Sequence, residues 1–296
     1  MANLRKKLAA NIDGNFFVDS TCINCDACRQ LAPETFQEHQ DSSSVFHQPA
    51  SEPDVHRAYQ AMIACPVGSI GVLHSDQHHW QEAMASFPLR LDKSLYYAGF
   101  NSDKSFGGNS YYLQHAEGNW LIDSPRYLTH LVDAFERMGG LRYIFLTHED
   151  DVADASRYAK RFGATRIIHR DDLAAVPEAE WIIDGRQPVS VSRQFQIIPV
   201  PGHTPGSMAL LYDRRYLFTG DHLWWDRDRK RLDIPQVYVW NQHDLERSTE
   251  RLLDVPCEWV LPGHGDRIHL PADEMRGQLE RLVRRRIAQP ANPDYS

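Results

Sequence analysis

Positions 145–154 read FLTHEDDVAD, a stretch that joins an apolar run to a predicted helix. The run Tyr143–Leu146 predicts a buried strand, and residues 152–162 have the composition of a helix. His148 and several carboxylates therefore stand where a strand ends and a helix begins. Such a group can bind a metal ion, but acids at a helix N-terminus also stabilise the helix itself. The stretch alone leaves both interpretations open.

Three further predicted strands end in a similar way. The strands and the side chains that follow them are residues 195–200 with His203, residues 216–219 with Asp221, and residues 259–261 with His264. A glycine stands beside each of these side chains, which lets the backbone bring them close to a shared point. Four strand ends of this kind favour one shared metal site over isolated surface residues.

Composition limits the classes of function. The chain has 296 residues, of which 42% are hydrophobic and 24% charged, as in globular proteins of one or two domains. Its net charge of -8 argues against nucleic-acid or anionic-membrane partners. The first ten residues lack the apolar segment of a secretory signal, and no run approaches the ~18 apolar residues of a membrane span. We therefore expect a cytoplasmic protein in a reducing compartment.

Four of the five cysteines belong to one motif. Cys22, Cys25 and Cys28 are spaced evenly in one loop, and Cys65 arrives from a predicted helix at residues 52–64 and is followed by proline. These thiolates can converge into a tetrahedral cage of soft ligands. Structural zinc sites use distant Cys-x-x-Cys pairs instead, so zinc is the less favoured occupant. The remaining cysteine, Cys257, is expected to be a buried free thiol.

The cysteine spacing is that of bacterial ferredoxins. The order strand, cluster loop, strand, helix, Cys-Pro and strand resembles a single-cluster ferredoxin domain over residues 10–74. The resemblance implies one [4Fe-4S] cluster held by Cys22, Cys25, Cys28 and Cys65. We place this iron-sulfur domain at residues 1–80, and expect a solvated polar linker at residues 75–90.

The later motifs also resemble a known family. They read THxD at 147–150, GHTPG at 202–206, TGD at 219–221 and PGHG at 262–265. This series looks like that of the metallo-β-lactamase superfamily, which includes thioesterases, nucleases, dioxygenases and flavodiiron proteins. The resemblance implies an αββα sandwich, which we place at residues 88–296. The predicted fold class is thus α+β, with a small ferredoxin-like domain followed by an αββα metallo-β-lactamase sandwich.

The first motif departs from the family pattern His-x-His-x-Asp-His. His148 is kept, Asp150 takes the second histidine position, and Val152-Ala153 stand at the final pair unless Asp154 replaces that acid from two residues further on. On the matching positions, the resemblance implies a first metal site of His148, Asp150, His203 and Asp221. It implies a second, less complete site of Asp221, His264 and either Asp154 or Asp151. A carboxylate suits iron or manganese at least as well as zinc, so we expect one or two divalent ions of Zn, Fe or Mn.

Three functions remain open. The favoured hypothesis is a metal-dependent hydrolase of thioesterase or phosphoesterase type, acting on a small-molecule substrate, with Asp150, Asp151 or Asp154 as the base that orients water. The second is a redox enzyme, served by a redox partner protein, in which the cluster passes electrons to an iron site. The third is a non-catalytic electron carrier or redox sensor. Aromatic residues between positions 224 and 240 can wall a substrate pocket or simply pack in the core.

Overall fold

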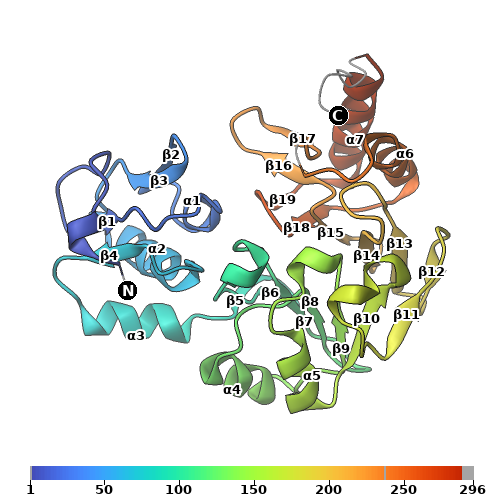
Figure 1. Cartoon of the computed structure of the whole chain (residues 1–296), viewed down its shortest axis with the longest axis horizontal. Helices are drawn as coiled ribbons and strands as arrows, with labels where there is room; N and C mark the ends of the chain where they lie inside the picture. Colours follow the sequence, from blue (N-terminus) through green and yellow to red (C-terminus); the bar gives the residue numbers. More distant parts are fainter. Residues whose placement is uncertain (1, 237, 289–296) are drawn as a thin grey trace. The chain divides into compact units, whose positions relative to one another are not determined.

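The computed structural model describes residues 2–236 and 238–288. The chain forms two compact units, Met1–Ile144 with Ala153–Ala164 and Phe145–Val152 with Thr165–Ser296 (Figure 1). Both units combine helices with β-strands. Within the described residues, no helix is both long and apolar enough to cross a lipid bilayer.

The first unit begins with two short antiparallel strand pairs. Strand β1 (Phe16–Val18) pairs with β4 (Ile70–Val72), and β2 (Phe36–His39) pairs with β3 (Ser42–Val45). Between them in the sequence lie helices α1 (Ala27–Leu31) and α2 (Glu52–Ala64). The helix predicted at residues 52–64 is confirmed. The side chain of Ser51 accepts a hydrogen bond from Asp54 N, and Pro53 suits the first turn.

The segment expected to be a linker is instead partly helical, as α3 (Gln77–Ala85). Asp76 caps this helix, because its side chain accepts hydrogen bonds from His78 N and His79 N. Ala83 is buried, and the His79 ring stacks on Tyr59 of α2. Trp80, Ala83 and Met84 do stand at helical spacing, but the polar, histidine-rich composition of the segment led to the prediction of a linker.

The rest of the first unit is an antiparallel series of strands with two packed helices. The strands pair in sequence order as β5 (Leu89–Asp92), β6 (Leu95–Tyr97), β7 (Tyr111–Leu113) and β8 (Trp120–Ile122). The helices are α4 (Thr129–Arg137) and α5 (Ala155–Phe162). Phe135 of α4 stacks on Tyr112 with ring centroids 4.7 Å apart, and Tyr158 of α5 lies 5.8 Å from Phe135. Strand β9 (Tyr143–Phe145) then leads the chain into the second unit.

The second unit is built on a six-stranded sheet. Its strands, in spatial order, are β12 (Val189–Ser190), β13 (Phe195–Pro199), β14 (Met208–Tyr212), β15 (Tyr216–Gly220), β18 (Trp259–Pro262) and β19 (Ile268–His269). Neighbours are antiparallel except β15 and β18, which are parallel. Outside this sheet, β10 (Thr165–His169) pairs in parallel with β11 (Trp181–Ile183), and β16 (Trp224–Asp226) forms a hairpin with β17 (Arg231–Asp233).

Helices α6 (Gln242–Arg251) and α7 (Ala272–Ala288) pack against this sheet (Figure 1). Leu245 of α6 and Met275 and Leu279 of α7 join one buried cluster with Leu211 and Leu217 of the sheet. Burying these side chains stabilises the layer by roughly 1.5–3 kcal/mol for each large aliphatic residue. The strand ends that carry the candidate site are therefore fixed by a continuous apolar core.

Candidate metal centre and cysteine cage

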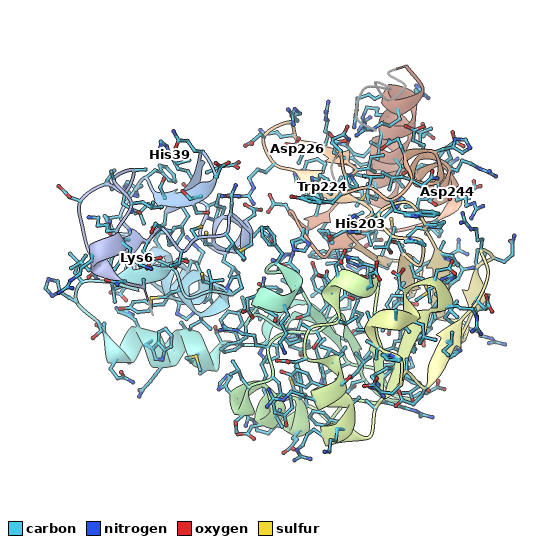
Figure 2. The ribbon with its side chains drawn as sticks, viewed as in Figure 1. Lys6, His39, His203, Trp224, Asp226 and Asp244 are labelled. Atoms are coloured by element: carbon cyan, nitrogen blue, oxygen red, sulfur yellow. The ribbon has the colours of Figure 1, made fainter. Side chains whose placement is uncertain are left out.

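The candidate metal centre lies where four chain segments of the second unit end or turn. His148 follows β9, His203 follows β13, Asp221 follows β15 and His264 follows β18. Because β15 and β18 are parallel neighbours, their carboxyl ends meet at one edge of the sheet and bring Asp221 beside His264. His203 and Trp224, the first residue of β16, belong to the same unit (Figure 2).

Two glycines permit this close approach. Gly220 has φ of +50°, and a Cβ there would lie 2.5 Å from Thr147 Oγ1. A Cβ at Gly263 would lie 2.6 Å from Asp151 Oδ2 and 2.7 Å from Asp221 Oδ1. Distances this short are not tolerated, so glycine is required at both positions if the polar side chains are to converge.

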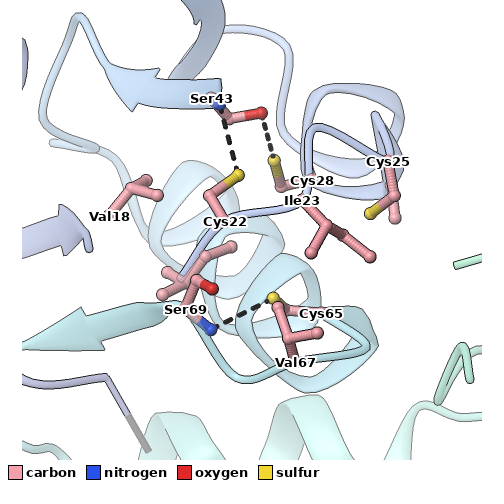
Figure 3. A pocket seen from close by; sticks show the side chains of 11 residues that line it. Val18, Cys22, Ile23, Cys25, Cys28, Ser43, Cys65, Val67 and Ser69 are labelled. Atoms are coloured by element: carbon pink, nitrogen blue, oxygen red, sulfur yellow. Dashed lines mark hydrogen bonds between the residues drawn. The ribbon is translucent and has the colours of Figure 1, made fainter. Parts of the chain in front are cut away.

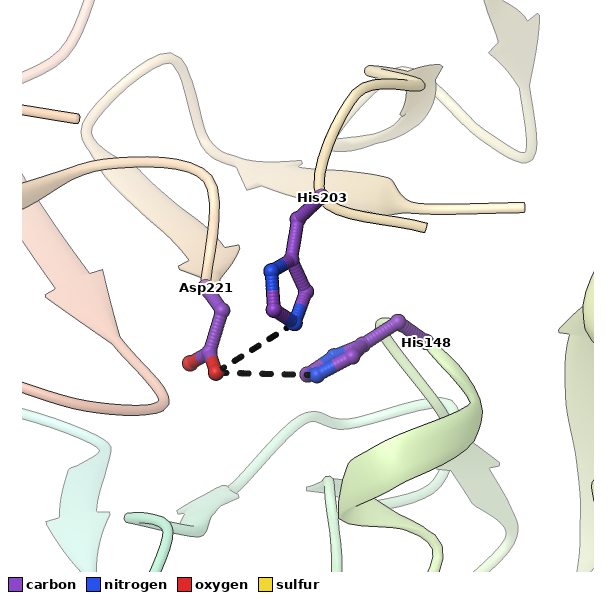
Figure 4. Close-up of side chains that lie close together, drawn as sticks. All are labelled: His148, His203 and Asp221. Carbon is purple, nitrogen blue, oxygen red and sulfur yellow. Dashed lines mark ion pairs between the residues drawn. The ribbon is translucent and has the colours of Figure 1, made fainter. Parts of the chain in front are cut away.

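The first group of candidate ligands consists of His148, His203, Asp150 and Asp221. Asp221 Oδ2 lies 3.7 Å from both His148 Nε2 and His203 Nε2 (Figure 4). Asp150 Oδ2 lies 3.8 Å from His148 Nε2 and 3.3 Å from His203 Nε2. Ligand atoms around a tetrahedral ion with bonds of about 2.1 Å are about 3.4 Å apart. His148, His203 and Asp221 form a group whose ligand atoms all lie within 4.8 Å of one another, so these three can hold one ion, and Asp150 adds a carboxylate beside both histidines.

The surroundings of His148 also fit a metal. Its Nδ1 lies 2.9 Å from Thr147 Oγ1, which orients the ring. Its Nε2 is buried and forms no hydrogen bond with any residue that the structure describes. A buried imidazole nitrogen without a partner costs free energy, and a metal ion would satisfy it. Burial also lowers the pKa of His148, which favours the neutral ring that binds metals.

A second group consists of Asp151, Asp221 and His264. One ligand atom from each lies within 4.8 Å of the others, and Asp151 is buried. His264 Nδ1 is 2.9 Å from both carboxylate oxygens of Asp221. Asp221 belongs to both groups, so its carboxylate can bridge two ions.

Asp154, which the sequence offered as a ligand and as a base, has other partners. Its carboxylate accepts hydrogen bonds from Lys104 Nζ at 2.7 Å and from Tyr127 N at 2.8 Å, all within the first unit. Among the described residues it joins neither ligand group. Asp151 joins the second group instead, because residues 149–151 form a 3-10 turn that begins at His148. Three residues per turn place positions 148 and 151 on the same side.

The neighbouring imidazoles and carboxylates shift the pKa values of Asp221 and His203. Burial opposes the charge on Asp221, but the positive potential of His264, His148 and His203 outweighs it and holds the pKa of Asp221 well below its usual range. Burial likewise opposes a proton on His203, yet the nearby carboxylates of Asp150 and Asp221 raise its pKa. A metal ion must displace that proton, so binding is expected to be coupled to proton release.

Sequence reasoning did not single out Asp172. This acid is fully buried in a 3-10 turn (Arg170–Ala175) after β10 and accepts a hydrogen bond from Glu149 N, beside His148. It also accepts one from Thr204 Oγ1, beside His203. The available signal was its position three residues after the end of a strand, β10, the same kind of place as the other four side chains.

The cysteine cage lies in the first unit. Cys22, Cys25, Cys28 and Cys65 line one cavity (Figure 3). Ser43 N donates to Cys22 Sγ and Ser69 N donates to Cys65 Sγ, each at 3.3 Å. Backbone donors to sulfur are typical of iron-sulfur sites, where they tune the reduction potential. Burial raises the pKa of Cys25 to about 12, so the cluster must bind strongly enough to drive off the thiol protons.

The cluster loop is fixed by Arg29. Its Nε donates to Asp26 Oδ1 at 2.6 Å and its Nη1 donates to Asn24 Oδ1 at 2.7 Å. Asn24 and Asp26 have φ of 57° and 68°, a left-handed conformation that asparagine and aspartate tolerate better than most residues. These hydrogen bonds and backbone angles define the shape of the loop between the cysteines.

Gly107 packs against the cage. It has φ of +88°, and a Cβ there would lie 2.7 Å from Cys25 Cβ and 2.8 Å from Cys25 Sγ. Its carbonyl accepts a hydrogen bond from Asn101 Nδ2 at 2.6 Å. Gly107 follows β6 in the strand series, so that series contacts the cluster loop directly within the first unit.

Two family models match the chain, one over each of the expected domains. Residues 18–72 match the 4Fe-4S single cluster domain of Ferredoxin I, and residues 89–270 match the Metallo-beta-lactamase superfamily. The resemblances inferred from the motifs are therefore confirmed.

Individual relatives match only part of the chain. A lactamase-like protein, GME11357 of Pestalotiopsis microspora, is 27% identical over 188 residues, covering 60% of this chain and 56% of its own length. A hydroxyacylglutathione hydrolase of Xanthomonas oryzae pv. oryzae is 25% identical over 192 residues, covering 60% of this chain and 72% of its own. The chain thus spans little more than half the length of the first of these relatives.

A solved structure supports the fold. The metallo-beta-lactamase family protein TTHA1429 from Thermus thermophilus superposes with a TM-score of 0.50 at 20% identity, covering 67% of this chain and 81% of that one. At this identity the likeness concerns the fold alone. The predicted α+β class, a ferredoxin-like part followed by a metallo-β-lactamase sandwich, is confirmed.

Proposed function

We propose that this chain, which belongs to the metallo-β-lactamase superfamily, is a metal-dependent hydrolase that also carries one [4Fe-4S] cluster. The observation that carries the hydrolase proposal is the convergence of His148, His203 and Asp221, whose ligand atoms all lie within 4.8 Å of one another, with Asp150 Oδ2 3.3–3.8 Å from the two histidines. We place the iron-sulfur domain at residues 1–80 and the hydrolase domain at residues 88–296, in a reducing, cytoplasmic setting that suits thiolate ligands.

The candidate residues would act as metal ligands, and one of them, Asp150, would also act as a base. His148, His203, Asp150 and Asp221 would hold one divalent ion, and Asp151, Asp221 and His264 a second. Such an ion supplies Lewis acidity toward a carbonyl or phosphoryl oxygen. Zinc, iron and manganese all suit this mixture of imidazole and carboxylate.

Asp150 is the candidate base. Its side chain is 61% exposed, whereas that of His148 is 1% exposed. Asp150 can therefore contact both a metal ion at the centre and a substrate that arrives from solvent. The hydrogen bond with His203 lowers the pKa of Asp150 and keeps it ionised. One oxygen, Oδ2, faces the two histidines, and a carboxylate has a second oxygen that can orient water or accept its proton.

A small-molecule thioester is the proposed substrate class, supported by the relatives named hydroxyacylglutathione hydrolase. The backbone of one exposed aromatic residue adjoins the centre: Trp240 is 51% exposed, and its backbone N donates to His203 O at 2.9 Å. An aromatic face there can cover an apolar acyl group.

A redox function is the second candidate. The contact of Gly107 with Cys25 joins the cluster loop to the strand series, and Asp150 suits iron. In that case a redox partner protein would reduce the cluster, which would pass single electrons to iron at the candidate centre.

Hydrolysis of S-lactoylglutathione and of a simple phosphodiester tests the proposal. Protein purified without oxygen should cleave at least one of them after addition of zinc, iron(II) or manganese(II). His203→Ala should abolish cleavage, while His243→Ala, which changes an exposed histidine of α6, should not. Transfer of an electron from the reduced cluster to ferric iron supplied at the centre, followed by electron paramagnetic resonance and lost in His203→Ala, would support the redox candidate instead.

A further inference from the structure

We infer that Asp172 is the positioning residue of the candidate centre, because one buried carboxylate holds the backbone beside both His148 and His203. The inference rests on the proposed metal centre but not on hydrolysis. It concerns the distance between the two imidazoles, and hence how tightly and in what geometry an ion is held.

Asp172 binds the loop of His203 at two points. Thr204 Oγ1 donates to Asp172 Oδ2 at 2.6 Å, and Gly206 N donates to Asp172 Oδ1 at 2.9 Å. The Thr204 hydroxyl also lies 2.8 Å from Ser207 Oγ, which closes the loop on itself. The residue directly after His203 is therefore fixed by a charged acceptor, the stronger type of hydrogen bond.

The same carboxylate binds the loop of His148. Glu149 N donates to Asp172 Oδ2 at 3.1 Å, so the residue directly after His148 is held as well. Asp172 Oδ2 is thus shared by the two loops, and Thr204 and Glu149 approach one atom. Any movement of one loop away from Asp172 changes the separation of His148 Nε2 and His203 Nε2.

The packing of Gly206 shows how closely the chain is built around Asp172. A Cβ at Gly206 would lie 2.5 Å from Asp172 Cγ and 2.6 Å from Asp172 Oδ1. Only glycine allows this approach. Asp172 itself is fully buried, and these three donors are neutral groups, so its negative charge is not cancelled by them. That charge also favours a cation nearby.

The structure offers a matched control in the adjacent residue. Asp171 carries the same charge one position earlier, but it is exposed and its Oδ2 lies 3.6 Å from His169 Nδ1. Asp171→Asn and Asp172→Asn therefore remove the same charge from the same turn. Only the second removes the carboxylate shared by the two loops and turns an amide NH2 toward donors.

The test is the zinc affinity of the full chain with its cluster, measured by competition with a chromophoric chelator. Asp172→Asn should weaken zinc binding by about 10–100-fold, the usual effect of losing a residue that orients metal ligands. Asp171→Asn should leave it unchanged. Zinc K-edge absorption should show fewer imidazole nitrogens in Asp172→Asn, a change that a merely structural role would not produce.

A second pair of variants keeps the test decisive if Asp172→Asn does not fold. Thr204→Val removes one donor to Asp172 and should weaken zinc binding by up to about tenfold, while Thr204→Ser keeps the hydroxyl and should restore it. Equal affinities of wild type, Asp172→Asn and Thr204→Val would overturn the inference, as would equal losses in Asp171→Asn and Asp172→Asn. Tight zinc binding without cleavage of any ester would overturn the hydrolase proposal alone.

Discussion

The cysteine cage and the histidine–aspartate centre are both suited to metals, yet they are assembled in opposite ways. Three cage ligands come from the seven residues Cys22–Cys28, and Arg29 fixes that loop by hydrogen bonds to its neighbours. The centre draws its side chains from four strand ends between His148 and His264. The cage is therefore a local structure, whereas the centre depends on the packing of the whole second unit.

This difference has a consequence for their chemistry. Four soft thiolates in a buried cavity select an iron-sulfur cluster, while imidazoles and carboxylates at a sheet edge select harder divalent ions. Since no side chain is shared, each site should lose its metal without affecting the other.

The largest expected effect is the loss of the whole cluster. Cys65→Ser removes one of the four thiolates, so iron should fall from about four atoms per chain to nearly none. Zinc binding at the centre should persist. Cys257→Ser, which changes a buried cysteine outside the cage, should keep the iron. Simultaneous loss of iron and zinc in Cys65→Ser would show that the two sites are not independent.

The next largest effect is a change in zinc content that distinguishes Asp151 from Asp154. Asp151→Ala should lower bound zinc from about two ions to about one, because it empties the second group. Asp154→Ala should keep all zinc but lower the free energy of unfolding by roughly 1–3 kcal/mol, since Lys104 and Tyr127 lose their acceptor. Metal analysis and denaturant unfolding measure both quantities. Loss of zinc in Asp154→Ala but not in Asp151→Ala would show that Asp154, rather than Asp151, is the metal ligand.

A smaller effect is expected on the rate at which the cluster loses iron. Two glycine variants distinguish the contact of residue 107 with Cys25 from the backbone strain of alanine at positive φ. Gly107→Ala and Gly163→Ala both place alanine at positive φ, which costs about 1 kcal/mol. A Cβ at Gly163 would meet no described atom within 4 Å, whereas one at Gly107 would collide with Cys25. Only Gly107→Ala should therefore speed the loss of iron to a chelator. Equal rates in the two variants would contradict the contact.

The smallest effect is a pH dependence of the metal-free chain. The pKa of His203 is raised above its unfolded value of about 6.5, so its contribution to stability is fully present below about pH 6.5 and lost as pH rises through the folded pKa. Denaturant unfolding after chelation, with the cluster retained, should show this decline, and His203→Ala should flatten it. An unchanged slope in His203→Ala would assign the decline to another group.

The sequence predicts the cage more fully than the centre for a physical reason. The cage is encoded by spacing within a short loop, and all four cysteines line one cavity as expected. The strand ends likewise mark His148, His203, Asp221 and His264, which the structure brings together.

What the sequence could not predict depends on turn geometry and burial. The position of Asp151 beside the centre follows from a 3-10 turn at residues 149–151, which lies just before the helix expected from residue 152. Asp172 touches both loops only after the chain has folded. Helix α3 carries only a short apolar pattern, Trp80, Ala83 and Met84, and is further stabilised by the cap at Asp76 and by contacts with α2.

The most direct measurement is a count of metals and acid-labile sulfide per chain, on protein purified without oxygen. A cluster beside a separate divalent centre predicts about four iron atoms with sulfide and about one or two zinc, iron or manganese ions in addition. Loss of only the additional ions in His203→Ala would place them at the centre. About four iron atoms and no further metal, even after zinc is supplied, would contradict a second metal centre.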